Sequence, residues 1–263
     1  MAEQQIRFDD GASYERMMGI WSRLVGDIFI DWLAPRLGLR WIDIGCGNGA
    51  FTELLVDRCA PAEVQGIDPS EGQLAFARTR PAGRVAEFSR GEAMALPFAE
   101  DRFDAVVMAL VIPLVANPAK AVAEMVRVAA PGATVATYVW DLVGGRSPAD
   151  LIDAELSARG IVLPRMPSVG ASGIDALRDL WTTAGLDAIE TREITVQRTF
   201  ADFDDFWSVN LLNPRLSAAL AALPSGDLER LRARALEQLP QDSATGAVTY
   251  TATANAIKAR LPA

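Results

Sequence analysis

The sequence predicts an α/β fold in which helices cover both faces of a doubly wound, mostly parallel sheet. Apolar runs at 41–44 and 103–109 lack the alternation of a half-exposed strand, which is typical of strands buried on both faces. Segments of helical periodicity follow them, at 50–58 and 118–129, so strands and helices alternate. The chain has 263 residues, 50% of them apolar, which suffices for one large domain with an elaborated cap.

The segment from Tyr14 to Leu33 predicts one or two amphipathic helices, bent near Gly19. Its apolar residues recur at helical spacing, as on a helix that buries one face against a sheet. Only Arg16 and Arg23 supply positive charge in this segment, which argues against a helix that lies on a membrane surface.

The stretch Trp-Ile-Asp-Ile-Gly-Cys-Gly-Asn-Gly at 41–49 predicts a nucleotide-binding turn between a strand and a helix. Gly45 permits a turn too tight for a Cβ, Gly47 lets the backbone approach a ligand, and Gly49 lets the helix sit against the strand. The helix N-terminus then presents its unpaired N–H groups to the ligand. Since Gly45, Gly47 and Ala50 also satisfy the dinucleotide pattern, the turn alone leaves the ligand open.

The next strand, 64–67, ends in Asp68, which lies about 20 residues beyond the glycines, the spacing at which an acidic residue meets ribose hydroxyls. The alternative is a turn Asp before Pro69. Ser70 and Gln73 form a capping box that starts the following helix.

The later elements complete the sheet and add a cap. We expect strands at about 85–89, 103–109, 134–140, 187–200 and 247–257, the last two paired antiparallel, and a helix at 174–185. Glycines and prolines punctuate 141–173, which favours an inserted cap, and 203–239 is helical in pieces broken at Pro214 and Pro224. Because ligands bind at the carboxyl ends of parallel strands, 109–113 should line the site.

Composition limits the function classes. The net charge of −9 argues against DNA, RNA and anionic membranes as partners and favours small, neutral or cationic substrates. The chain has no histidine, so it has no Ser-His-Asp unit and no His-based metal site, and Cys46 and Cys59 are too few thiols for one. With no apolar run of membrane length and no secretory signal in 1–10, we expect a cytoplasmic protein.

The pattern Asp43-x-Gly45-x-Gly47-x-Gly49 resembles motif I of the class I S-adenosylmethionine-dependent methyltransferases. The resemblance extends over roughly 10–140 and includes Glu-x-x-Arg-Val-x-x-Pro-Gly at 124–132, where Ala133 replaces a second glycine. It points to the small-molecule, ubiquinone/menaquinone-methyltransferase-like branch. It implies a Rossmann-like, seven-stranded sheet with an antiparallel last strand, and S-adenosylmethionine as cofactor. The Asn/Asp-Pro-Pro-Tyr/Phe tetrapeptide of many enzymes that methylate nucleobase amino groups is missing.

The same resemblance implies roles for individual residues. In that family the N-terminal helices close over the cofactor, and an aromatic residue there can face the sulfonium by a cation–π contact. An acidic residue at Glu92 lies near the adenine amino group, although a surface Glu is the alternative. Gln73 stands where the family often has an apolar residue. The cofactor-binding residues we expect are Tyr14, Trp21, Asp43, Gly45, Gly47, Gly49, Asp68, Pro69, Gln73, Glu92, Ala93 and Ala109.

Methyl transfer is an in-line displacement that needs alignment and exclusion of water. Without histidine, either the acceptor needs little deprotonation or a carboxylate or tyrosine is the base, and Asp141 is the best-placed carboxylate. Its alternative role is to cap a loop. The substrate-wall candidates, which could equally be core residues, are Ile112, Tyr138, Trp140, Phe206 and Trp207.

Two other functions remain open. One is an NAD-dependent oxidoreductase, although that class would expect a second mononucleotide-binding half and the chain has no Tyr-x-x-x-Lys. The other is a non-catalytic regulatory protein that binds S-adenosylmethionine, because binding and catalysis are separable. The acceptor, its reacting atom and the oligomeric state are not specified by the sequence.

We expect a single domain over 1–263. Its parts are N-terminal lid helices at 1–38, a cofactor-binding core at 39–141, cap insertions at 142–173 and 201–245, and 174–200 with 246–263 completing the sheet.

Overall fold

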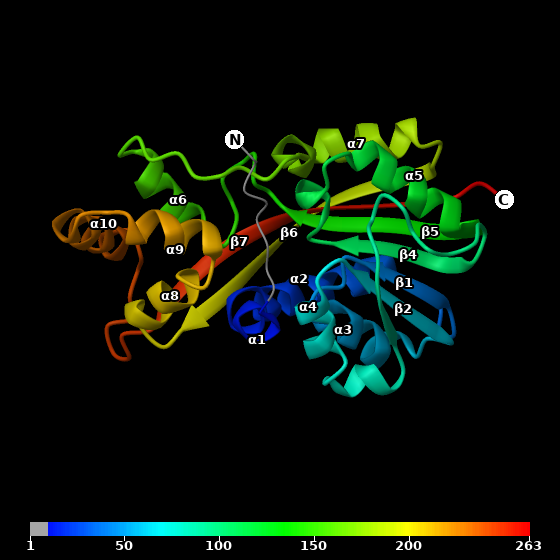
Figure 1. Cartoon of the computed structure of the whole chain (residues 1–263), viewed down its shortest axis with the longest axis horizontal. Helices are drawn as coiled ribbons and strands as arrows, with labels where there is room; N and C mark the ends of the chain where they lie inside the picture. Colours follow the sequence, from blue (N-terminus) through cyan, green and yellow to red (C-terminus); the bar gives the residue numbers. More distant parts are fainter. Residues whose placement is uncertain (1–9) are drawn as a thin grey trace.

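The computed structural model describes residues 10–263, and a seven-stranded sheet runs through them (Figure 1). The strands are β1 Arg40–Ile44, β2 Glu63–Asp68, β3 Glu87–Arg90, β4 Phe103–Ala109, β5 Ala129–Trp140, β6 Asp187–Phe200 and β7 Val248–Arg260. Their order is β3-β2-β1-β4-β5-β7-β6, with β7 antiparallel to both of its neighbours and the other pairs parallel. This confirms the predicted sheet, including its reversed last strand.

Helices cover both faces of the sheet (Figure 1). One face packs against α2 Ile20–Leu33, α3 Ala50–Cys59 and α4 Glu71–Ala77, and the other packs against α5 Pro118–Val128 and α7 Ile174–Thr183. Each face has its own apolar cluster, with Phe29 and Trp41 in the first and Val106 and Trp181 in the second. Short 3-10 turns, η2 Pro81–Arg84, η3 Ile112–Leu114 and η4 Val169–Ser172, connect these elements.

The cap helices gather around the far ends of β6 and β7, beyond the rest of the sheet (Figure 1). They are α6 Asp150–Ser157, α8 Phe203–Asn210, α9 Pro214–Ala221 and α10 Ser225–Glu237. The breaks at Pro214 and Pro224 fall where the sequence predicts them. Helix α6 was not predicted; it forms in a short stretch without Gly or Pro, where Ile152 and Leu156 are buried one turn apart.

The N-terminal helix is interrupted near Gly19, as expected. It consists of α1 Gly11–Tyr14, the π-helical segment η1 Glu15–Gly19, and α2. Such π-helical turns are uncommon and frequent at functional sites. Residues 1–9 of the expected lid lie outside the described residues.

β3 lies at Glu87–Arg90, against the expected 85–89, and the largest differences in strand boundaries are at β5 and β7. β5 begins at Ala129 instead of 134, because the chain pairs with Phe103 before the register shifts at Pro131-Gly132, where Gly132 has φ +75°. β7 continues to Arg260, beyond the expected 257. Over 10–263, no helix has the length and apolar character needed to cross a membrane.

Candidate active site

The three glycines of the turn have left-handed backbone conformations, with φ of +71° at Gly45, +53° at Gly47 and +78° at Gly49. At Gly45, an added Cβ would overlap the Val111 side chain, and at Gly49 it would lie 3.0 Å from Ala77 Cβ. At Gly47 nothing lies nearer than 4.0 Å. Gly45 and Gly49 are therefore required by packing, whereas a Cβ at Gly47 would come only into ordinary contact with Gln73 and Tyr14.

Asp68 lies at this turn, at the end of β2, and is 9% exposed. Its Oδ2 accepts the Gly47 N–H at 3.0 Å and its Oδ1 accepts the Ser70 N–H at 2.8 Å. The Gly91 N–H donates to the Asp68 carbonyl at 3.2 Å, which brings the exposed Glu92 to the same edge of the sheet. The structure thus brings together two predicted carboxylates and the glycine turn.

Asp43 lies beneath the turn and is fully buried. Its Oδ2 accepts the Thr52 hydroxyl at 2.7 Å, but Oδ1 has no hydrogen-bond partner within 10–263. Burial, helped by the nearby Asp68 and opposed by the Thr52 hydrogen bond, raises the pKa of Asp43 to about 7. A buried acceptor without a partner is costly, so this oxygen is suited to a ligand donor group.

The N-terminal segment covers the glycine turn. Tyr14 Cε1 lies 4.0 Å from the position that a Cβ of Gly47 would occupy. Asn48 Nδ2 donates to the Gly11 carbonyl at 3.2 Å and to Glu15 Oε2 at 2.8 Å. Burial, with Asp68, Glu15 and Asp43 nearby, raises the pKa of the Tyr14 phenol well above its usual range, so this ring is neutral.

Arg80 connects the N-terminal segment to the glycine turn by hydrogen bonds and ion pairs. A role for Arg80 was not predicted from the sequence. The Arg80 side chain is 8% exposed. Its Nε donates to the Asn48 carbonyl at 2.6 Å, Nη1 to Glu53 at 2.8 Å, and Nη2 to Glu15. No sequence pattern links Arg80 to partners that lie 27 to 65 residues away. We call Arg80, Glu15, Glu53 and Asn48 the latch.

Replacing Arg80 by methionine is expected to lower the free energy of unfolding by about 3 kcal/mol, because the carboxylates of Glu15 and Glu53 would lose their buried cation. Urea denaturation measures the change. Arg230→Met is the matched control: Arg230 also pairs with a carboxylate but is 72% exposed, so no measurable loss is expected there. Equal losses in both variants would refute a buried latch.

Two expected ligand contacts lie in the core instead. Tyr138 has no exposed surface; its hydroxyl lies 3.0 Å from Ser22 Oγ and donates to the Ser22 carbonyl at 3.2 Å. Trp21 is 2% exposed and packs edge-on against Trp140, with ring centroids 6.0 Å apart. Both side chains are enclosed by neighbouring side chains, which leaves them no face for a ligand.

Asp141, the expected base, is held by other groups. It is 5% exposed; its Oδ1 accepts the Gly144 N–H at 2.9 Å and its Oδ2 accepts Arg146 Nε at 2.6 Å. The structure therefore favours the alternative role, a carboxylate that caps the loop after β5. The signal was present in the sequence, because Arg146 follows only five residues later.

The remaining candidates divide between the site and the core. Gln73 is 3% exposed, and its side-chain oxygen is 4.0 Å from the Cβ position of Gly47, so it belongs to the turn. Phe206 and Trp207 pack with Phe203 in the cap, and Ile112 has no exposed surface. Ala109 is half-buried at the end of β4, Ala93 is half-buried in the turn after β3, and Pro69 is exposed.

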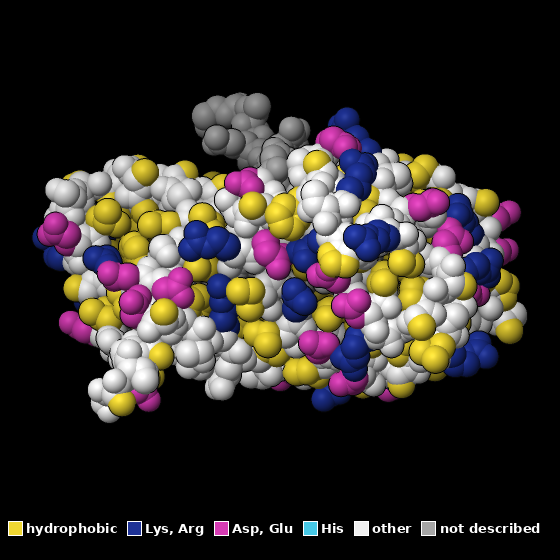
Figure 2. Space-filling model, turned by 90° about the horizontal axis from the view of Figure 1, so that it is seen from below, with side chains coloured by type: hydrophobic (Ala, Val, Ile, Leu, Met, Phe, Trp, Pro, Cys, Tyr) yellow, Lys and Arg dark blue, Asp and Glu magenta, His cyan; other side chains and the backbone are white. Residues whose placement is uncertain are grey.

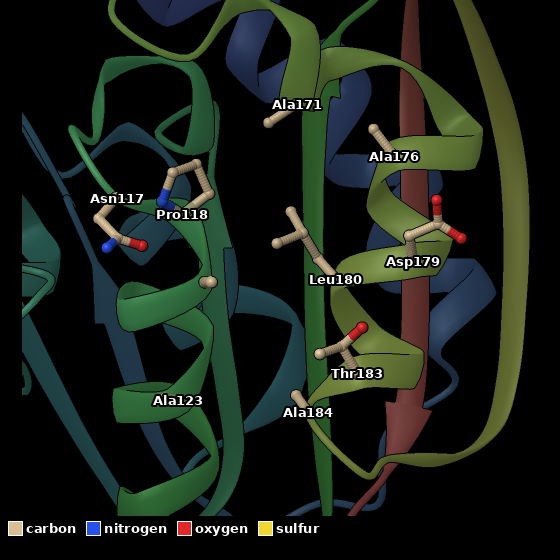
Figure 3. A pocket seen from close by; sticks show the side chains of 10 residues that line it. Asn117, Pro118, Ala123, Ala171, Ala176, Asp179, Leu180, Thr183 and Ala184 are labelled. Carbon is tan, nitrogen blue, oxygen red and sulfur yellow. The ribbon is translucent and has the colours of Figure 1, made fainter.

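A groove of about 710 Å³ lies elsewhere, between α5 and α7 (Figure 3). Figure 3 shows Asn117 and Pro118 on one side, with Leu180 and Thr183 on the other. None of the expected site residues lines it, so it is separate from the glycine turn. Over residues 10–263, no group of three or more His, Cys, Asp or Glu side chains is placed to hold a metal ion.

The reversed last strand and the glycine turn over Asp43 and Asp68 define a Rossmann-like fold of the kind expected for class I methyltransferases. A sequence model of the methyltransferase domain family matches residues 42–137. A ubiquinone/menaquinone biosynthesis C-methyltransferase of Cereibacter sphaeroides is 31% identical over 216 residues, which are 80% of this chain and 82% of that protein.

The corresponding protein of Paracoccus denitrificans is 38% identical over 120 residues, which are 44% of this chain and about half (48%) of that relative's length. A solved structure of a methyltransferase-like protein from Bacillus halodurans has the same fold, with a TM-score of 0.59 and 18% identity over 90% of this chain and 99% of that one. The chain belongs to the class I S-adenosylmethionine-dependent methyltransferases.

Proposed function

We propose that the protein transfers the methyl group of S-adenosylmethionine to a small-molecule acceptor by in-line displacement, without a histidine base. The observation that carries the proposal is that the Gly47 N–H, the Asp68 carboxylate and Asp43 Oδ1 meet at one edge of the sheet, and that Asp43 Oδ1 has no hydrogen-bond partner among residues 10–263. A nucleoside joined to a cationic amino acid supplies matching groups: hydroxyls for a carboxylate and an ammonium for a buried acceptor.

Each part of the site would hold a different part of the cofactor. Asp43 and the turn at 45–49 would hold the amino acid end, Asp68 the ribose hydroxyls, and Glu92 with the Ala93 N–H the adenine. The cofactor supplies a methyl group already activated on a sulfonium. The chain's own part is to orient it and exclude water, for which the latched lid over Gly47 is placed.

Acceptor chemistry follows from what the site lacks. The chain has no histidine, and Asp141 is ion-paired with Arg146 at 2.6 Å, so we propose that no strong protein base acts on the acceptor. Such a site suits an acceptor atom that is nucleophilic with little deprotonation. The names of the two relatives make a small-molecule carbon acceptor the first to test.

The surface agrees with a small acceptor. On the face shown in Figure 2, Lys and Arg side chains are interspersed with Asp and Glu, with no broad basic patch for a polyanion.

Cofactor binding is expected to tighten as the pH rises through about 7. Ionised Asp43 offers a negative charge to the cofactor ammonium, and protonated Asp43 does not, so each pH unit below 7 should weaken binding by up to about tenfold. Calorimetric titration with S-adenosylhomocysteine from pH 6 to pH 8 measures this. Asp43→Asn, which resembles the protonated acid, should flatten the profile; an unchanged slope in that variant would contradict the assignment.

The same shift has a stability consequence of defined sign. Without ligand, Asp43 titrates near 7 in the folded chain and near 3.9 in the unfolded one, so the folded state holds the extra proton between these values. Stability from this group is therefore fully present below about pH 3.9 and is lost as the pH rises through 7. Urea denaturation across this range should show the loss in the native chain but not in Asp43→Asn.

Labelled-methyl transfer from S-adenosylmethionine to a panel of phenols, enols, amines, thiols and carboxylates tests the function itself. Transfer to at least one acceptor, abolished in Asp68→Ala, supports it. Tight cofactor binding with no acceptor methylated would favour the alternative of a regulatory protein that binds the cofactor without catalysis.

A further inference from the structure

Arg198 is a buried cation on strand β6. It lies between Val196 and Phe200 on the face of the strand that packs into the core, and it is 8% exposed. A charged side chain at such a position is rare unless it has a partner of opposite charge.

Arg198 has few partners for its charge. Its Nη1 donates to the Met17 carbonyl at 3.1 Å, and its Cζ lies 4.5 Å from the centre of the Phe200 ring. In the described part of the chain, no carboxylate lies within 4.0 Å of it, whereas the equally buried Arg80 has two. Asp205 is the acidic residue that acts on the charge of Arg198, and its Oδ2 accepts the Ala201 N–H at 3.2 Å.

Burial of Arg198 without a paired carboxylate carries an electrostatic cost. Burial lowers the pKa of Arg198, the exposed Arg16 lowers it further, and Asp205 opposes both. A guanidinium stays protonated at neutral pH, so it cannot escape the cost by losing its charge. A buried cation without a counter-ion is therefore suited to an anion from outside the chain.

The Arg198 guanidinium is not completely sealed from solvent. Nε and Nη2 of Arg198 are not among the described side-chain atoms that are sealed from solvent without a partner. They retain donor capacity in the fork geometry that matches a carboxylate. The guanidinium also contacts the lid, because Met17 lies in η1, three residues after Tyr14. Arg198 is therefore on the cap side of the segment that covers the glycine turn.

The surroundings of Arg198 are apolar and aromatic. Tyr250 is its direct partner across β6 and β7, and the Tyr250 ring lies 5.5 Å from that of Phe206 and 6.5 Å from that of Trp21. One buried guanidinium balances one negative charge, which fits a carboxylate better than a phosphate dianion. Of these rings only Tyr250 is half-buried rather than buried, and a ligand that packs against it would be aromatic or aliphatic.

We propose that Arg198 binds the carboxylate of the methyl acceptor, so that the acceptor class is an apolar or aromatic carboxylic acid. This rests on the proposed methyl transfer and adds the group that selects the acceptor. It departs from the neutral or cationic substrate expected from the net charge of −9, because the local charge at Arg198 is positive.

Matched ligands test the proposal without requiring turnover. Phenylacetate with phenylacetamide, and octanoate with octanamide, differ only in charge, and phenyl phosphate tests the alternative anion. Calorimetric titrations are made on the whole chain saturated with S-adenosylhomocysteine and on the chain alone. We expect at least one carboxylate to bind about tenfold or more tighter than its amide, as for a charge-assisted hydrogen-bonded pair.

Arg198→Met should abolish this discrimination, and Arg198→Lys should keep part of it, because lysine retains the charge without the fork. Arg198→Met removes a buried cation that lacks a counter-ion. The melting temperature of this variant should therefore equal or exceed that of the native chain. If Arg198 only stabilised the fold, the melting temperature of Arg198→Met would instead fall by a large amount. The proposal is overturned if neither carboxylate binds, if phenyl phosphate binds more tightly than phenylacetate, or if the discrimination survives in Arg198→Met.

Failure of the proposed function looks different. Titration with S-adenosylhomocysteine should be the same in the native chain and in Arg198→Met, since Arg198 is not one of the cofactor contacts. If the native chain does not bind S-adenosylhomocysteine, methyl transfer fails, while the carboxylate titrations on the chain alone still decide the role of Arg198.

Discussion

Gly45→Ala should lower the free energy of unfolding by about 3 to 4 kcal/mol, a large part of the stability of a typical domain. Two costs add. An alanine at φ +71° is strained by about 1 to 2 kcal/mol, and its Cβ would overlap Val111, which costs a further 1 to 3 kcal/mol. Val111 cannot simply rotate away, because its own Cβ lies 3.2 Å from the new atom.

Gly38→Ala is the control that separates the cost of the backbone angle from the cost of the overlap with Val111. Gly38 has nearly the same φ, +75°, but nothing lies within 4 Å of its Cβ position, so only the conformational cost of about 1 kcal/mol is expected. Urea denaturation of both variants gives the difference directly. Equal losses would show that Gly45 is needed for its backbone angle alone and that the packing of the turn against Val111 contributes nothing.

Asp68→Ala should weaken binding of S-adenosylhomocysteine about 100-fold. Two hydrogen bonds from ribose hydroxyls to an ionised carboxylate would be lost, each worth about 1.5 kcal/mol or more. The variant also releases the Gly47 and Ser70 N–H groups, which donate to the Asp68 carboxylate. Asp68→Asn, which keeps one acceptor oxygen, should lose about tenfold.

Glu71→Ala is the control for Asp68→Ala. Glu71 lies three residues away, is exposed and pairs with Arg78 on the surface, so its removal makes the same change in net charge beside the turn. No measurable change in affinity is expected for it. If both variants lost affinity equally, the effect would be one of general charge, and Asp68 would have no direct contact with the ligand.

The parts of the fold that the sequence predicts are those fixed by local rules. Positive φ at Gly45, Gly47 and Gly49 follows from the need for a tight turn, and the strand that ends in Asp68 follows from spacing. The Ser70 cap, which accepts the Gln73 N–H at 3.3 Å, is also local. These features depend only on residues that are close together in the chain, so the sequence pattern is enough to predict them.

The direction in which an aromatic side chain points is a tertiary property. Tyr138 and Trp140 end a strand at the ligand edge, and nothing in the alternation of residues says that helix α2 covers them. The latch is beyond sequence reasoning for the same reason, since Arg80 acquires its partners only when three separate elements meet. Arg198 alternates with apolar residues on a predicted strand, a signal that could have been noticed.

The account depends most on the identity of the molecule bound at the glycine turn. Calorimetric titration of the native chain with S-adenosylmethionine and, separately, with NAD measures this directly. We expect one S-adenosylmethionine to bind per chain and NAD to give no binding heat. Binding of NAD without binding of S-adenosylmethionine would contradict the account.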